Sequence, residues 1–361
     1  MPTAATRRPP RRLTLIAGAL ASAVALALSA CSDAASEGGN GAPQSGGGED
    51  GELTEITVVS FLPLESFTFT PEMMAYSGGY FEDQGLDVTL EPVQGTAAAI
   101  QSVVGGAGFI SRASTIDLMP AMEDGQDIVG VGTMARRTNL RVASVEDNPI
   151  ESTADMAGET IGLGSIGGTS ERSLDLALGH DGVDLDSVER QAVPVTAATM
   201  ELVRRGELAG YIVSLDTAIG IELQNDDAVV GPAGLDVTPD IQLFFTTPGT
   251  LESDPETVEA FLAAIADATQ FVVDDAENDF DETLQILRDS GDWDFAALQD
   301  DEAARLALED YVTNTWMDES GTPLLQTDPT VVESAYDALT EGGLVDGGAD
   351  PTEWITNDYV P

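Results

Sequence analysis

The stretch SIGGTSERS places small and hydroxylated residues where a predicted strand passes into a predicted helix. These residues are Gly167, Gly168, Thr169 and Ser170. Free N–H groups and the positive end of a helix dipole favour an anion or a carbonyl oxygen, and the two hydroxyls add hydrogen-bond donors. A plain helix cap with a tight turn has the same composition. The position of the loop relative to a binding cleft therefore decides between the two interpretations.

The segment after the first predicted strand, SFLPLESFTF, offers a hydroxyl and two aromatic rings to the same cleft edge. Phe61 and Phe67 can stack on a flat solute, and Ser66 can bind a polar group. Aromatic residues in such a segment are also typical of a hydrophobic core. We keep all three as candidate ligand-binding residues.

The segment after the third predicted strand contains the cationic candidate of the predicted cleft. In the run Ser111-Arg112-Ala113-Ser114, Arg112 can pair with a sulfonate or a carboxylate, and Ser111 and Ser114 are further candidate ligand-binding residues. A surface salt bridge with one of the 64 acidic residues is the alternative. Thr133 and Asp216 come at the ends of two other predicted strands, positions that direct side chains towards a cleft. Both are predicted to bind ligand.

Enzymatic interpretations are weak. His180 is the one histidine and Cys31 the one cysteine of the chain. Thiol catalysis after Cys31, a triad with histidine and a Cys/His metal site are therefore excluded, and we expect no metal and no cofactor. Carboxylates are abundant, but a catalytic pair needs a geometry that sequence does not give.

The single cysteine ends an apolar run. Residues 13–30 are uncharged and follow an arginine-rich start, which predicts an export signal over residues 1–30. Leu28-Ser29-Ala30-Cys31 resembles the lipobox of bacterial lipoproteins, and this resemblance implies a lipid on Cys31. An ordinary signal peptide and a retained membrane span are the alternatives, and a twin-arginine route stays open. Residues 31–52, rich in Gly and Ser, are predicted to form a disordered tether.

The formal net charge is −50, and the chain has no lysine. Such a chain repels nucleic acid and anionic lipid headgroups, so both are poor candidates for partners, and we expect no nucleic acid partner. The acidic surface is typical of proteins adapted to high salt. The alternative is that it reflects a proteome generally rich in alanine and aspartate. An apolar content of 42% excludes wholesale disorder, and the residues after the tether are enough for two lobes.

Strand-like and helix-like segments alternate along residues 53–250, which predicts an α/β protein with mostly parallel sheets and ligand at the carboxyl ends of the strands. The predicted strands are residues 55–61, 86–93, 107–110, 127–133, 159–164, 188–195, 209–214 and 241–248. The helices between them are predicted from residue 71 to 78, at 96–104, 114–123, 167–179 and 197–205.

The C-terminal third is predicted to be helical. Ser253 and Glu256 have the spacing of a capping box, with Pro255 in the first turn. The apolar residues of the helix that follows share one face. They are Val258, Phe261, Leu262 and Ile265.

An ordered series of motifs resembles a known family. MMAYSGGYFEDQGLDVTLEPV, STIDLMPAMEDGQDIVGVGT, STADMAGETIGLGSIGGTSERSLDLAL and VRRGELAGYIVSLDTA are similar, in this order, to substrate-binding proteins of ATP-binding-cassette importers for nitrate, sulfonates, taurine and hydroxymethylpyrimidine. The similarity covers residues 56–273. The chain departs from the family at Gly108-Phe109, where Asp-Phe is common, and at Ala209-Gly210, where Asp-Ala is common.

The resemblance implies a two-lobed periplasmic-binding-protein type II fold with two crossings between the lobes. Lobe 1 would comprise residues 53–140 and 243–361, and lobe 2 residues 141–242. The implied function is that of a monomeric, extracytoplasmic, lipid-anchored protein that delivers a small solute to a permease and its ATPase. A small anion such as an alkanesulfonate, taurine or nitrate is the first expectation. A flat heterocycle such as a pyrimidine or thiamine precursor, and a sensor role on the same fold, are the alternatives.

Overall fold

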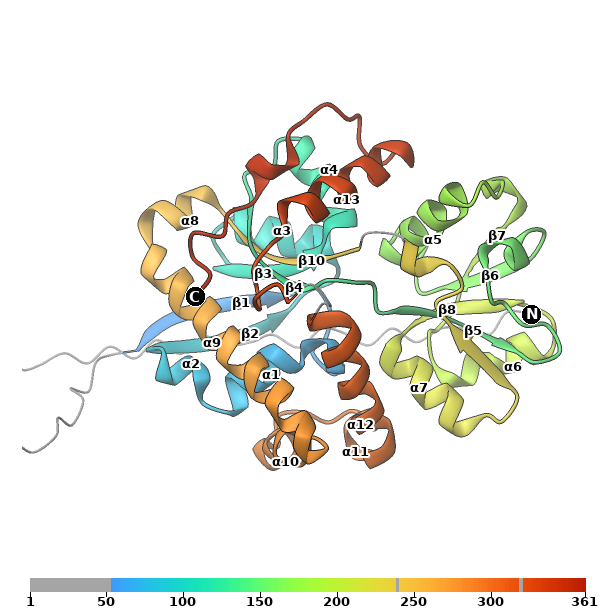
Figure 1. Ribbon diagram of the computed structural model, residues 1–361, viewed down its shortest axis with the longest axis horizontal. Coiled ribbons are helices and arrows are strands. Elements are labelled where there is room, and N and C mark those ends of the chain that lie inside the picture. Colours follow the sequence, from blue (N-terminus) through green and yellow to red (C-terminus); the bar gives the residue numbers. More distant parts are fainter. Residues whose placement is uncertain (1–52, 238–239, 318–320) are drawn as a thin grey trace, which may run out of the picture. The chain divides into compact units, whose positions relative to one another are not determined.

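The computed structural model describes residues 53–237, 240–317 and 321–361, whose strands form two five-stranded sheets flanked by helices (Figure 1). The first sheet has the order β2-β1-β3-β10-β4, with bounds Leu86–Pro92, Thr54–Ser60, Ile110–Ser114, Gln242–Thr246 and Val129–Ala135. The second has the order β7-β6-β8-β5-β9, with bounds Glu189–Ala192, Thr160–Leu163, Gly210–Ser214, Leu140–Val145 and Ala228–Gly231.

Both sheets are mixed, because one strand in each enters from a crossing. β5 begins beside the end of β8, where Leu140 pairs with Ser214, and runs antiparallel to it. β10 begins beside the end of β3, where Gln242 pairs with Ser114, and also runs antiparallel. β10 is also antiparallel to β4, and β5 to β9. The pairs β1 with β2, β1 with β3, β6 with β7 and β6 with β8 are parallel. The chain therefore passes between the sheets twice, each time at the carboxyl edge of the parallel strands.

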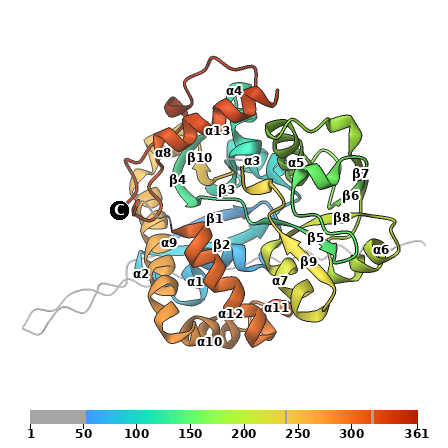
Figure 2. The same ribbon diagram turned by 45° about the vertical axis from the view of Figure 1, so that its right-hand side comes forward.

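The first sheet is covered on both faces, and its strands alternate accordingly. Ile56 and Val58 of β1 belong to one core cluster, and Val59 belongs to the other. Figures 1 and 2 show α1, α2 and α9 on one side of this sheet and α3, α4 and α13 on the other. These helices span Thr70–Ser77, Tyr80–Asp83, Pro255–Asp275, Thr96–Val104, Thr115–Glu123 and Pro329–Glu341.

The second sheet is also packed on two faces. Val142 and Ile212 belong to a core cluster with residues of α5 (Thr169–His180), whereas Ala143 and Val213 belong to one with residues of α6 (Met200–Arg204) and α7 (Leu215–Gln224). α7 also contributes Leu215 to the core cluster of the first sheet. This helix therefore packs against both lobes.

Local signals predicted several helices well and one cap wrongly. α3 has the bounds expected from the sequence, and Ser114 caps α4 by accepting from the Ile116 N–H. The predicted apolar face of α9 is confirmed, because its four residues are fully buried. The capping box is wrong: Asp254 is the N-cap of α9, and Ser253 ends α8 (Pro248–Ser253), where its hydroxyl bonds to Asp254.

Candidate functional site

A crevice of about 320 Å³ lies between the two lobes. Lobe 1 contributes the loop after β1 and the short helices α11 (Ala296–Gln299) and α12 (Asp301–Asp310). Lobe 2 contributes the segment after β7, the end of β8 and one face along the length of α7. The lining residues are Glu65, Ser66, Val195, Thr196, Ala197, Ser214, Asp216, Thr217, Gly220, Leu223, Gln224, Phe295, Ala296, Ala297, Asp300 and Ala303.

Asp216 is the buried acid of this crevice. It lies in the first turn of α7, and its Oδ2 accepts from the Ser66 hydroxyl and, at 3.0 Å, from the Phe67 N–H. Burial raises the pKa of Asp216, and these two hydrogen bonds act in the opposite direction. Asp216 therefore connects lobe 2 to the loop after β1 in lobe 1.

Two further polar side chains lie behind Asp216. Tyr311, fully buried in the π-helical segment Tyr311–Trp316, accepts a hydrogen bond at 3.1 Å from Asn139 of the first crossing. Burial and the charge of Asp216 raise the pKa of Tyr311 well above its usual value. The crossing, α7 and the C-terminal helices thus meet through polar groups.

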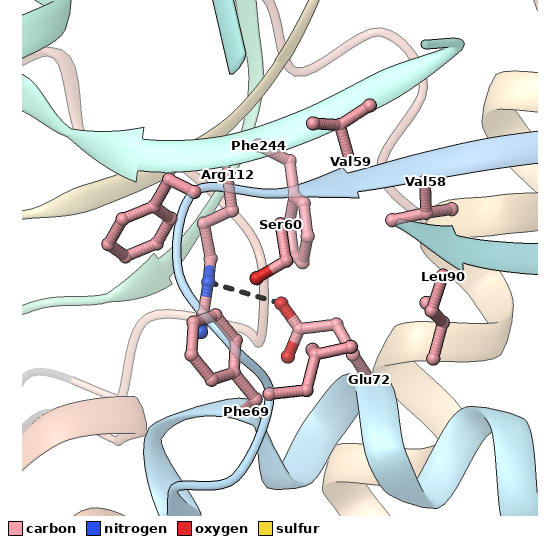
Figure 3. Close-up of a pocket in the computed structure, with 10 residues that line it drawn as sticks. Val58, Val59, Ser60, Phe69, Glu72, Leu90, Arg112 and Phe244 are labelled. Carbon is pink, nitrogen blue, oxygen red and sulfur yellow. Dashed lines mark ion pairs between the residues drawn. The ribbon is translucent and has the colours of Figure 1, made fainter. Parts of the chain in front are cut away.

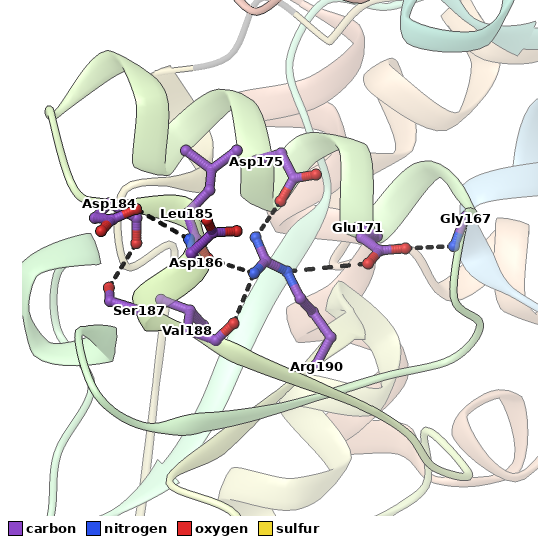
Figure 4. Close-up of polar contacts among 9 residues, drawn as sticks. All are labelled: Gly167, Glu171, Asp175, Asp184, Leu185, Asp186, Ser187, Val188 and Arg190. Atoms are coloured by element: carbon purple, nitrogen blue, oxygen red, sulfur yellow. Dashed lines mark hydrogen bonds and ion pairs between the residues drawn. The ribbon is translucent and has the colours of Figure 1, made fainter.

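The loop at the start of α5 is held by carboxylates on two sides. Gly167, with φ of +79°, adopts the left-handed conformation that glycine favours, and its N–H donates to Glu171 (Figure 4). Arg190 lies 3.9 Å from Glu171 and also pairs with Asp175. Gly168 is the N-cap residue and Ser170 is half-buried. The first N–H group of the loop therefore already faces a carboxylate of its own helix.

Asp117 of α4 contacts the same loop from lobe 1. Its Oδ2 accepts from the Thr169 hydroxyl at 2.7 Å and from the Thr96 hydroxyl at 3.1 Å. Its Oδ1 accepts from Arg172 at 2.5 Å. The hydroxyl expected to face a solute thus bonds to the opposite lobe.

Arg112 is neither exposed nor free. Its Nε lies 3.1 Å from Oε1 of Glu72, both side chains are almost fully buried, and its Nη2 donates to the Thr68 carbonyl at 2.8 Å (Figure 3). The guanidinium carbon lies 4.9 Å from the centre of the Phe69 ring. Burial raises the pKa of Glu72, and burial lowers that of Arg112. The predicted surface salt bridge is thus a buried one, beside a small enclosed cavity of about 10 Å³.

Several predicted ligand residues make contacts within lobe 1 and lie outside the crevice lining. The Ser111 hydroxyl donates to the Val59 carbonyl at 2.7 Å, and the Thr133 hydroxyl donates to Thr327 at 2.9 Å. Phe67 is fully buried, with its ring 5.1 Å from that of Phe295. Phe61 is half-buried, with its ring 5.6 Å from that of Phe69, and lines the small cavity.

The second crossing contains an acid that the sequence analysis missed. Asp240 is buried and accepts from the hydroxyl of Ser114, the predicted residue at the end of β3. Burial, with a smaller contribution from the negative charge of Asp117, raises the pKa of Asp240 to about 6, although hydrogen bonds from Ser114 and Thr138 lower it. Thr138 belongs to the first crossing, so this cluster ties both crossings to lobe 1.

A family model described as NMT1/THI5 like matches residues 66–278. The chain belongs to this family. The riboflavin-binding protein RibY of Chloroflexus aurantiacus is 23% identical over 329 residues, which cover 86% of this chain and 87% of RibY.

Solved structures with this fold carry different functions. The periplasmic aliphatic sulphonate binding protein SsuA of Escherichia coli has a TM-score of 0.63 at 15% identity over 84% of this chain and 97% of its own. The periplasmic nitrate-binding protein NrtA of Synechocystis PCC 6803 has a TM-score of 0.57 at 16% identity, and the match covers 85% of this chain and 87% of NrtA. The desulfurization enzyme DSZB has a TM-score of 0.55 at 14% identity, and the match covers 85% of this chain and 97% of DSZB. The two-lobed α/β fold expected from the motifs is thus confirmed.

Three further features of this NMT1/THI5-like chain concern its histidine, metal binding and membrane-spanning helices. His180 is exposed at the end of α5, with Nδ1 3.0 Å from Asp181. Among the described residues no group of three His, Cys, Asp or Glu side chains is arranged to hold a metal ion. No helix in the described ranges has the length and apolar character needed to cross a membrane. Residues 1–52, with Cys31, lie outside the described part of the chain.

Proposed function

We propose that the chain is the solute-binding component of an importer and captures a small solute in the interlobe crevice. The observation that carries the proposal is the crevice itself. It lies between two lobes connected by two crossings, and residues of both lobes line it. Its volume of about 320 Å³ is at the lower end of the range usual for small-molecule sites, about 300–1,000 Å³. A hinge motion about the crossings would open it.

The role is binding rather than catalysis. Among the described residues no histidine lines the crevice, and the polar side chains of the lining are hydroxyls, Gln224 and three carboxylates. The chain belongs to the NMT1/THI5-like family, and the similar proteins RibY, SsuA and NrtA are named as binding proteins, which supports a binding role. DSZB, which shares the fold, is named as an enzyme. The arginine-rich leader and the lipobox-like segment support a location outside the cytoplasm and attachment through a lipid on Cys31.

A crevice-filling substitution tests solute capture. Gly220 lines the crevice, and a Cβ there would meet nothing within 4 Å. Gly220→Phe should therefore fill the crevice without disturbing the fold. Gly179→Phe, on an exposed helical glycine whose Cβ position is equally open, is the matched control.

The readout is native mass spectrometry of each protein recovered from the producing cells. We expect a bound small molecule in the unaltered chain and in Gly179→Phe, and none in Gly220→Phe. A molecule that stays bound in Gly220→Phe would place solute capture elsewhere in the chain.

A further inference from the structure

The two lobes meet along two seams. At the first seam, α7 of lobe 2 packs against α12 and the loop after β1 in lobe 1, and Figures 1 and 2 both show α7 next to α12. At the second seam, α5 of lobe 2 packs against α4 and α13 of lobe 1. Each seam contains a carboxylate that accepts hydrogen bonds from the opposite lobe and apolar side chains that the opposite lobe covers.

The carboxylate of the first seam is Asp216 of lobe 2. Its Oδ2 accepts from the Ser66 hydroxyl and from the Phe67 N–H. Asp216 also forms a side-chain hydrogen bond with Tyr311, in the segment that follows α12. These three partners all belong to lobe 1, so separation of the lobes at this seam would break their bonds to Asp216.

The carboxylate of the second seam, Asp117 of lobe 1, occupies the start of α5. It accepts from the Thr169 hydroxyl and from Arg172, both on lobe 2. The Gly167 N–H of the same loop donates to Glu171 of α5 itself. Asp117 is therefore an internal ligand of the loop that the sequence predicted to bind a solute.

Apolar side chains of lobe 2 are buried against lobe 1 at both seams. Leu215 and Ile219 of α7 are buried in a core cluster whose other members lie in lobe 1. Leu176 of α5 is buried in a cluster with residues of α4 and α13. Separation of the lobes would expose these three side chains to water, which disfavours an open arrangement.

We propose that the closed arrangement is the resting state of the protein and that the two seams hold it closed without a solute. The seams join protein groups directly, so closure does not depend on a solute that bridges the lobes. A hydrogen bond to a charged group shifts an equilibrium about tenfold to a hundredfold. In the described part of the chain, Asp117 and Asp216 accept such bonds across both seams. A solute would enter during brief openings, which lowers its association rate.

Distances between spin labels on the two lobes test the resting state. Ser334→Cys on α13 and Asp186→Cys after α5 place one label on each lobe at exposed positions. The full chain also carries Cys31→Ser, so that the introduced cysteines are its only thiols. This labelled chain is unfolded in urea, dialysed and refolded to remove any bound molecule, and native mass spectrometry checks the removal.

The first seam variant removes the hydrogen bonds at the start of α5. Thr169→Val with Arg172→Ala deletes both lobe 2 donors to Asp117, whose bond from Thr96 stays. Arg205→Ala, which deletes an exposed ion pair within lobe 2, is the matched control.

The second seam variant is a wedge. A Cβ added at Gly342, at the end of α13, would overlap the side chain of Leu176 across the seam. Gly342→Leu should therefore push α5 away from α13. Gly179→Leu adds the same side chain at an exposed glycine of α5 whose Cβ would meet nothing within 4 Å, and it is the matched control.

We expect one narrow distance distribution in the labelled chain and in both controls. Each seam variant should shift the distribution towards longer distances, and the combined variant should shift it most. A broad distribution in the labelled chain itself, or an unshifted one in the combined variant, overturns the closed resting state. Circular dichroism checks that each variant folds, and Gly342→Leu alone decides where the combined variant does not.

This inference goes beyond solute capture, and its failure is distinguishable from the failure of the proposed function. A bound molecule that is present in the unaltered chain and absent from Gly220→Phe supports capture even where the spin labels show lobes that rest open. Lobes that rest closed in a chain that never contains a bound molecule would support the resting state and count against capture.

Discussion

Replacing Asp240 by Asn should change how stability depends on pH. In the folded chain, burial raises the pKa of Asp240 from 3.8 to about 6. At about 1.36 kcal/mol per pKa unit this rise corresponds to about 3 kcal/mol. The asparagine introduced there would keep the hydrogen bond from Ser114, since its carbonyl oxygen accepts as the carboxyl oxygen does.

The sign follows from where the proton is held more tightly. Below about pH 4 the carboxyl group is protonated in both states, and its contribution to the free energy of unfolding is fully present. Between about pH 4 and 6 the unfolded chain has released the proton while the folded chain still holds it, so stability falls as the pH rises. Above about pH 6 both states are ionised, and the contribution of about 3 kcal/mol is lost.

The assay is urea unfolding, followed by circular dichroism, at intervals from pH 4 to pH 8. Between these limits, the free energy of unfolding of the unaltered chain should fall by up to about 3 kcal/mol relative to that of Asp240→Asn. Other acids titrate in both proteins and largely cancel in the difference. Asp226→Asn, with an exposed side chain, should give a flat difference over the same range. A flat difference for Asp240→Asn as well would refute the argument that burial at the crossing raises this pKa.

Two further substitutions test the buried ion pair and the anchor. Glu72→Gln should cost about 3–5 kcal/mol in urea unfolding because it leaves Arg112 charged and buried. Arg112→Met should cost less, because a buried carboxyl group can take up a proton whereas a guanidinium cannot lose one, and equal costs would contradict this argument. Cys31→Ser should move the protein from the membrane fraction to the soluble fraction, since the lipid is the proposed attachment. Retention in the membrane after signal cleavage would instead indicate that residues 13–30 form a retained span.

The sequence predicted elements whose signals are local. The strand β1, the helix α3 and the buried face of α9 follow from β-branched runs, glycine stops and apolar spacing. α7 was missed, as were β5 and β9. The buried residues of α7 face both lobes, with Leu215 in one core cluster and Ala218 in another, so its polar and apolar residues do not separate into the two faces of an amphipathic helix.

The site was predictable only in part, because its partners are distant in sequence. Asp216 stood out by its place after a strand, but the hydroxyl it binds lies 150 residues away. Ser114 stood out in the same way, and its partner Asp240 is 126 residues away. Composition gave no means of choosing these acids from the 64 in the chain. The same limit left the partner and the burial of Arg112 unpredicted, since Glu72 was one acid among many.

The contacts between the lobes are reciprocal, and this bears on how a solute would be held. Asp117, in the first turn of a lobe 1 helix, accepts from Thr169 and Arg172 of lobe 2. Asp216, in the first turn of a lobe 2 helix, accepts from Ser66 and the Phe67 N–H of lobe 1. Opening the crevice would break both sets and return each carboxylate to water, which compensates part of the loss. The protein's own hydrogen bonds thus provide part of the free energy of the closed arrangement. A solute captured in the crevice needs to supply only the remainder, because its apparent affinity scales with the fraction of molecules already closed.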